Sequence, residues 1–284
     1  MVNDRNALEI YPGLATSDGA GVRLTRYIGS QQLDHLDPFL LLDFFQSDNP
    51  DDYIAGFPSH PHRGFETVTY LLAGRVRHED NAGHAGIIET GGIQWMSAGR
   101  GIVHSEMPEQ KDGQLAGFQL WVNLPAAKKM TAPRYQEFSS REIPVESRAQ
   151  AVEIRVIAGD TSFGTQGPVR DVSTRPIYLD IALPPGQSFY EPVPTDYTAF
   201  VFVIDGPLRI CGRTTEKDML IAAKQLATLE TGDRVHLAAE NAPARCLLIC
   251  GQPLKEPIAR YGPFVMNTRE EVLKAAHDFQ SGNF

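Results

Sequence analysis

Short apolar runs, bounded by glycine, proline or polar residues, recur along the whole chain. Their length and two-residue alternation are typical of β-strands. The predicted strands are Val22–Ile28, Thr67–Leu72, Gly117–Asn123, Val152–Ala158, Ile177–Leu183, Thr198–Ile204, Ala227–Leu229 and Cys246–Cys250. The clearest helix signal comes last, where Thr268 and Glu271 form a capping-box pattern that opens a helix through about Phe279. The pattern predicts an all-β chain with a short C-terminal helix.

The strand pattern of the first half recurs in the second half. Residues 64–78, GFETVTYLLAGRVRH, resemble residues 196–210, DYTAFVFVIDGPLRI, with Gly74 matching Gly206. The tripeptide Glu-Thr-Gly at 89–91 also recurs, at 230–232. Two barrels of similar plan are the simplest explanation of this repeat.

The stretch at residues 139–150 separates the two halves. It is polar and without periodicity, as expected of a linker. We therefore predict an N-terminal domain over residues 1–138 and a C-terminal domain over residues 139–284.

Composition narrows the class of protein. Of the 284 residues, 42% are hydrophobic and 21% are charged, which is ordinary for a globular protein. The net charge of -9 argues against direct binding to nucleic acid. The three cysteines, Cys211, Cys246 and Cys250, are expected to be buried free thiols. The start lacks a signal-peptide core and no stretch is long enough to span a membrane, so we expect a cytoplasmic location.

Two triplets carry metal-ligand side chains. His60-Pro61-His62 is followed, forty-two residues after His62, by His104-Ser105-Glu106. Because side chains at i and i+2 of a strand share a face, each triplet presents two ligands in one direction. Three imidazoles and a carboxylate suit a divalent transition metal. The spacing therefore predicts a metal site wherever these two strands face each other.

A second carboxylate is also a candidate ligand, because alternation along the first strand places His60, His62, Gly64 and Glu66 on one face. Glu66 is therefore expected to point into the same cavity, and the spacing alone leaves the choice between Glu66 and Glu106 open.

The repeat assigns the metal to the first half. When Gly74 and Gly206 are aligned, Pro192 and Pro194 fall opposite His60 and His62. The second half cannot supply three imidazoles, so we expect its barrel to be degenerate and without metal.

The motifs resemble a known family at this point. G-x3-HxH-x3-E-x7-G (56–74) and G-x5-A-G-R-G-x2-H (92–104) resemble the two cupin motifs, and the longer words HPHRGFETVTYLLAGRVRHEDNAG, GGIQWMSAGRGIVHSEMP and DPFLLLDFF resemble the pirin family. The resemblance implies two tandem cupin barrels of the double-stranded β-helix or jelly-roll type. It also implies one iron(II) ion held by His60, His62, His104 and Glu106, with Glu66 beside the pocket. Zinc, copper, nickel, manganese and cobalt remain open.

Several other side chains are placed near this site by the sequence. Candidates for an aromatic pocket wall are Phe44, Phe45, Trp95, Met96 and Trp121. Arg63 and Arg100 flank the ligands and are expected to support a loop through backbone or carboxylate bonds. His78 and His84 are expected to be solvated or structural.

The resemblance implies a quercetin 2,3-dioxygenase-like activity, with a flavonol and O2 as substrates and Glu106 or Glu66 as the base. The alternative is an iron-dependent redox-sensing regulator that modulates transcription factors or metabolic enzymes through protein contacts. A deep cavity that reaches the metal favours catalysis, and a closed site favours sensing. We expect a monomer with no membrane contact.

Overall fold

The computed structural model describes residues 2–284, which form two compact units that exchange the ends of the chain. The N-terminal barrel consists of Leu14–Ser140 together with Leu254–Phe284. The C-terminal barrel consists of Arg141–Pro253 together with the segment that ends at Gly13. The predicted contiguous domains, 1–138 and 139–284, meet close to the observed division but differ from it at both chain ends.

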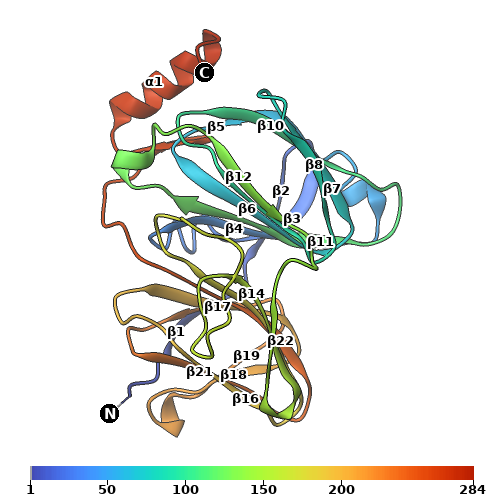
Figure 1. Ribbon diagram of the computed structural model, residues 1–284, viewed down its shortest axis with the longest axis vertical. Coiled ribbons are helices and arrows are strands. Elements are labelled where there is room, and N and C mark those ends of the chain that lie inside the picture. Colours follow the sequence, from blue (N-terminus) through green and yellow to red (C-terminus); the bar gives the residue numbers. More distant parts are fainter. Residues whose placement is uncertain (1) are drawn as a thin grey trace. The chain divides into compact units, whose positions relative to one another are not determined.

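The N-terminal barrel has two antiparallel sheets that face each other. The larger sheet has the strand order β12 (Arg134–Phe138), β9 (Ile93–Ser97), β6 (Phe65–Ala73), β11 (Leu115–Asn123), β4 (Phe39–Ser47), β3 (Val22–Ile28) and β2 (Leu14–Asp18). The smaller sheet has the order β5 (Phe57–His62), β10 (Ile102–Pro108), β7 (Arg75–Asp80) and β8 (Ala85–Glu89). A hairpin of β23 (Ala259–Tyr261) and β24 (Phe264–Met266) leads into the helix α1 (Arg269–Gln280), drawn in red in Figure 1.

The C-terminal barrel repeats this plan strand for strand. Its larger sheet has the order β1 (Ala7–Tyr11), β20 (Leu226–Leu229), β17 (Thr198–Asp205), β22 (Ala244–Gly251), β15 (Ile177–Leu183), β14 (Val152–Ala158) and β13 (Val145–Arg148). Its smaller sheet has the order β16 (Ser188–Pro192), β21 (Arg234–Ala239), β18 (Leu208–Ile210) and β19 (Met219–Ile221). Short 3₁₀ helices lie at Pro50–Asp52, Ala126–Lys128, Ala149–Ala151 and Thr215–Lys217. The all-β class and every predicted strand are confirmed.

Equivalent turns carry the predicted repeat. Gly74 joins β6 to β7 with φ +88°, and Gly206 joins β17 to β18 with φ +71°. Both turns need a residue that adopts the left-handed region without strain, which explains glycine at both positions. The predicted equivalence of the two Glu-Thr-Gly tripeptides is wrong. Residues 89–91 precede β9, whereas residues 230–232 follow β20, the strand that corresponds to β9.

Two buried cations hold the exchanged segments. In the N-terminal barrel, Lys129 Nζ donates to Asn123 Oδ1 (2.6 Å), to the Gly64 carbonyl (2.7 Å) and to the Val265 carbonyl of β24 (3.0 Å). In the C-terminal barrel, Arg5 donates to the carbonyls of Gly232, Tyr197 and Pro194 at 3.1, 2.8 and 2.7 Å. Each charged group therefore stabilises its terminal segment through hydrogen bonds that offset the cost of burial.

The helix α1 begins as the sequence predicts. The Thr268 side chain accepts a hydrogen bond from the Glu271 amide (3.2 Å), and the Glu271 carboxylate accepts from the Thr268 amide (3.0 Å). This reciprocal pair satisfies two amides that the helix itself leaves without partners. Among the described residues, no helix is long and apolar enough to cross a membrane.

The interior of the C-terminal barrel is filled by apolar side chains. The cluster extends across both of its sheets and includes Ile154, Leu179, Ile181, Phe189, Val201, Val235, Leu237, Cys246, Leu248 and Cys250. The predicted free, buried thiols are confirmed, and burial raises the pKa of Cys250 to about 12. The C-terminal barrel therefore has an apolar core that joins its two sheets.

Candidate metal centre

Strand pairing brings the three predicted histidines together. On the smaller sheet of the N-terminal barrel, β5 pairs with β10 so that His60 lies opposite His104 and His62 lies opposite Ile102. The ring centroids are 4.6 Å apart for His60 and His62, 4.5 Å for His60 and His104, and 5.0 Å for His62 and His104. Their ligand atoms lie within 4.8 Å of one another, as expected of side chains that share one ion.

The tautomer of His60 follows from its hydrogen bond. Its Nδ1 lies 2.8 Å from the Pro58 carbonyl oxygen, which can only accept, so Nδ1 carries the proton and Nε2 carries a lone pair. That Nε2 lies 3.1 Å from His104 Nε2. Two ligands bound at about 2.1 Å to one ion and at right angles are about 3 Å apart, so the spacing suits a shared metal.

Burial keeps the other two imidazoles neutral. His62 and His104 are 2% and 1% exposed. Burial and the neighbouring imidazoles hold the pKa of His62 well below its usual range, and burial lowers the pKa of His104 to about 4. Among the described residues, His62 Nε2 has no hydrogen-bond partner. A buried lone pair without a partner is costly unless a cation binds it, so these residues fit a metal.

The carboxylate of Glu106 is held by the opposite sheet. Thr69 Oγ1 donates to Glu106 Oε1 (2.8 Å), and Gln119 Nε2 donates to Glu106 Oε2 (3.3 Å). Glu106 lies two residues after His104 and is 6% exposed, so it belongs to the same interior face. The tight group of ligand atoms comprises the three histidines, and Glu106 stands beside it.

The expected position of Glu66 is wrong. The strand breaks at Gly64, where φ is +89°, and β6 starts in a new register at Phe65. Thr69 on β6 reaches Glu106 in the interior, so Glu66, three residues earlier, points to the opposite face of the sheet. There it accepts a short hydrogen bond from Ser97 Oγ. Burial raises the pKa of Glu66 to about 6, but the side chain is on the wrong face to meet a substrate.

A cavity of about 550 Å³ is lined by His60, His62 and Glu106. Of the predicted aromatic wall, Phe45 and Trp121 line this cavity. Phe44 and Trp95 lie on the opposite face of the same sheet, because Phe44 adjoins the cavity-lining Phe45 and Trp95 pairs with Val68, one residue before the inward-facing Thr69. The Arg260 guanidinium lies over the Trp121 ring at 4.8 Å from its centroid and completes the wall from the C-terminal segment.

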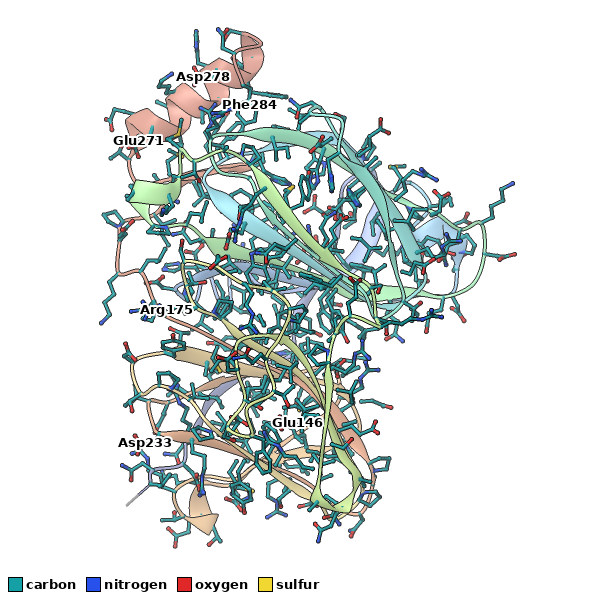
Figure 2. The ribbon with its side chains drawn as sticks, in the orientation of Figure 1. Glu146, Arg175, Asp233, Glu271, Asp278 and Phe284 are labelled. Carbon is teal, nitrogen blue, oxygen red and sulfur yellow. The ribbon has the colours of Figure 1, made fainter. Side chains whose placement is uncertain are left out.

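The predicted loop support by Arg63 is confirmed. Its Nε donates to the Arg100 carbonyl (2.5 Å), its Nη1 forms an ion pair with Asp278 (2.8 Å), and its guanidinium lies 4.5 Å from the centroid of the Phe284 ring. Figure 2 labels Asp278 on α1 and Phe284 next to this helix. Arg63 therefore connects the ligand strand β5 to the C-terminal helix.

Sequence reasoning missed the residues that surround the carboxylate and close the cavity. Gln119 and Thr69 carry a usable signal, because each is a polar residue on the inward face of a largely buried strand. Arg260 carries none, since it arrives from a segment more than a hundred residues away. His78 was expected to be solvated or structural, and it is 1% exposed, beside Glu137.

The two repeated barrels, with three clustered histidines in one and an apolar interior in the other, define a bicupin. The chain belongs to the pirin family: the Pirin model matches residues 21–122, and the model of the Pirin C-terminal cupin domain matches residues 178–284. A pirin-like protein of Caulobacter vibrioides is 52% identical over 99% of both chains. Human pirin is 44% identical over 93% of this chain and 89% of its own.

A solved structure shows the same bicupin fold. The quercetin 2,3-dioxygenase from Acinetobacter baumannii has a TM-score of 0.88 at 35% identity, over 99% of this chain and 98% of that chain. The predicted fold of two tandem cupin barrels with a short C-terminal helix is therefore confirmed.

Proposed function

We propose that the protein is a metal-dependent dioxygenase that cleaves a flavonol such as quercetin. The observation that carries this proposal is the 550 Å³ cavity, which reaches the clustered histidines and is walled by Phe45, Trp121 and Arg260. This volume lies in the range of about 300–1,000 Å³ that is usual for small-molecule sites. The similarity to the quercetin 2,3-dioxygenase from Acinetobacter baumannii supports the same substrate class.

The ligands that would hold the metal are His60, His62, His104 and Glu106. The family resemblance favours iron(II) within the range of divalent metals that this ligand set accepts. A bound metal would supply Lewis acidity that lowers the pKa of a coordinated hydroxyl group.

Glu106 is the side chain placed to accept the proton of that hydroxyl. Thr69 and Gln119 hold its two carboxylate oxygens, which limits rotation and keeps one edge of the group near the histidines. Trp121 and Phe45 offer flat apolar surfaces against which an aromatic substrate can pack. The same cavity favours catalysis over the redox-sensing alternative, because a sensor needs no space for an organic molecule.

Oxygen uptake tests the proposal. Metal-loaded protein incubated with quercetin in air should consume oxygen well above the rate without protein. His62→Ala removes one of three imidazoles, so metal content and oxygen uptake should fall together, each by at least tenfold. His35→Ala is the matched control, because His35 is an exposed histidine that contacts Asp34 on the surface.

Uptake at the background rate by protein of full metal content would refute the dioxygenase proposal. A pull-down with ferrous and ferric protein would then test the sensing alternative, which requires that the two states capture different partners.

A further inference from the structure

Three further metal-ligand side chains gather in the N-terminal barrel outside the candidate metal centre. His78 comes from β7, His84 from the turn before β8, and Glu137 from β12 of the opposite sheet. Their ligand atoms lie within 4.8 Å of one another. Because His78 lies opposite Glu106 in the pairing of β7 with β10, this second cluster adjoins the first on the same barrel wall.

Each oxygen of the Glu137 carboxylate faces one imidazole. His78 Nε2 lies 2.5 Å from Glu137 Oε1, and His84 Nε2 lies 3.5 Å from Glu137 Oε2. Two ligand atoms bound at about 2.1 Å to one tetrahedral ion are about 3.4 Å apart. The contact between His84 and Glu137 is therefore too long for a good hydrogen bond and has the right length for two ligands of one ion.

Buried nitrogen atoms in this cluster lack partners. His78 is 1% exposed, and among the described residues its Nδ1 has no hydrogen-bond partner. The same holds for His84 Nε2, the atom that faces Glu137. Leaving such atoms without a partner is unfavourable, and a cation beside His84 Nε2 would remove that cost at one of them.

The surroundings of the cluster hold it in place. Gln94 Nε2 donates to Glu137 Oε1 (2.5 Å), and the Tyr135 ring stacks on His84 with centroids 4.2 Å apart and planes at 28°. Gly86 leaves the space open, because a Cβ there would lie 2.5 Å from His78 Nε2 and 3.2 Å from Glu137 Oε2. Such supporting contacts orient the ligands in known metal sites.

The charge and the access to solvent also suit a cation. The Glu137 carboxylate would supply the negative charge that a divalent cation favours in its ligands. His84 is 42% exposed through its side chain and lines a cavity of about 840 Å³ together with Tyr135 and Asp80. An ion can therefore reach the cluster from solvent.

We propose that His78, His84 and Glu137 form a second metal site that binds a divalent transition-metal ion of the zinc class. Two imidazoles and one carboxylate are an established ligand set for such ions, and the fourth position is left to water. The proposal does not depend on the dioxygenase activity. The competing explanation is that His78 and Glu137 merely share a proton, in which case no second ion binds.

Zinc stoichiometry separates the two explanations. The full-length protein is freed of metal with a chelator and titrated with Zn²⁺ by calorimetry, and bound zinc is counted by elemental analysis after dialysis. We expect two equivalents for the wild type and one for His84→Ala and for Glu137→Gln. His62→Ala should also bind one equivalent, and His62→Ala combined with His84→Ala should bind none.

Controls separate ligand loss from unfolding. His84 and Glu137 are partly exposed, so their variants should keep the thermal transition of the metal-free wild type. His35→Ala should retain both equivalents. Gly86→Ala keeps every ligand but places a methyl group against His78 Nε2, so it should also lose the second equivalent.

Two results would overturn the proposal. The first is a wild type that binds one equivalent, lost in His62→Ala and kept in His84→Ala. The second is a pair of variants, Glu137→Gln and Gly86→Ala, that both retain two equivalents. Cobalt substitution gives a second readout. The visible absorption of the fully loaded wild type should exceed the absorption of a single site, and it should change in His84→Ala.

Discussion

The carboxyl group of Glu66 shows that the face of a strand on which a side chain lies decides what it can contact. Glu66 sits four residues after His62, yet it bonds with Ser97 on the face of the sheet away from the cavity. Its raised pKa therefore reports burial and has no connection with catalysis. The same shift makes Glu66 a source of pH-dependent stability.

Replacement of Glu66 by glutamine should change the pH dependence of unfolding. Burial raises the pKa of Glu66 from 4.5 to about 6 in the folded state, so folding favours the protonated form. Below pH 4.5 this carboxyl group is protonated in both states and does not reduce stability. As the pH rises from 4.5 through 6, the free energy of unfolding falls by about 2 kcal/mol in all. Glu66→Gln cannot ionise, so urea unfolding should show it gaining about 1–2 kcal/mol on the wild type between pH 5 and pH 8.

Glu153→Gln is the matched control, because Glu153 is an exposed residue of β14. Its difference from the wild type should be the same at both pH values. If Glu66→Gln behaves like this control, the carboxyl group does not titrate as its burial implies.

Spacing within one strand was enough to find the histidines of the first site, because His60 and His62 need only alternation to share a face. Alternation failed for Glu66 because it assumes an unbroken strand, and Gly64 breaks it. The grouping of His78 and His84 with Glu137 could not be predicted, because Glu137 lies on β12 of the opposite sheet and is distant from both histidines in the sequence. The sequence carries no short-range signal for such a convergence.

At the scale of elements, Gly64 is the link between the ligand strand and the C-terminal hairpin. Its φ is +89°, and a Cβ at this position would lie 2.0 Å from the Val265 carbonyl oxygen. The same carbonyl accepts from Lys129, so the backbone of β24 has little room to withdraw. The close approach of two backbones explains glycine here.

Alanine at Gly64 should therefore destabilise the protein far more than alanine at Gly83. Gly83 has nearly the same φ, +87°, but a Cβ there would have nothing within 4 Å. Gly83→Ala should thus show only the backbone strain, about 1–2 kcal/mol, and Gly64→Ala should add at least as much again for the clash. Urea unfolding of both variants measures the two costs. Equal urea midpoints for the two variants would show that β24 can move away from residue 64 without a measurable cost in stability.

Strands were predictable because each keeps one period from end to end, as in β14 and β15, whose predicted bounds are the observed ones. The Glu-Thr-Gly repeat misled because three turn residues recur by chance wherever strands end. The Gly74 and Gly206 match held because a long apolar strand of the same sequence type precedes each glycine. Equivalence between barrels thus depends on strand context more than on identical tripeptides.

At the scale of the whole chain, the exchange of the two chain ends determines which fragments can fold alone. A fragment of residues 1–138 would lack β23, β24 and α1, and would carry β1 without its partner β20. A fragment that joins residues 14–140 to residues 254–284 through a flexible linker of about 15 residues contains the entire N-terminal barrel.

The joined fragment should unfold in one cooperative urea transition, and the 1–138 fragment should not. Removal of residues 254–284 exposes Phe65, which packs against Val265, and leaves Lys129 without one of its three acceptors. Circular dichroism during urea titration follows the transition, and the intact chain is the reference. Comparable midpoints for the two fragments would mean that the C-terminal segment adds little to this barrel.

The exchange could not be anticipated from the sequence. A polar linker near residue 140 marks the boundary in the middle of the chain, and the observed division falls between Ser140 and Arg141. The first 13 residues contain an ordinary strand, and a strand pattern does not say which sheet edge it will join. Pairing of β1 with β20 is decided by tertiary contacts, such as those of Arg5 with the backbone at Pro194, Tyr197 and Gly232.

The exchange of ends also fixes when the protein can mature during its synthesis. The N-terminal barrel emerges first from the ribosome, but Arg260, Val265 and Asp278 are made last. The 120 residues from Arg141 to Arg260 take roughly 6–24 s to translate, and during that time the histidine pocket lacks one wall. β1 likewise has no partner until β20 has been made, more than two hundred residues later. The candidate metal centre can therefore be complete only after the C-terminal segment has been made.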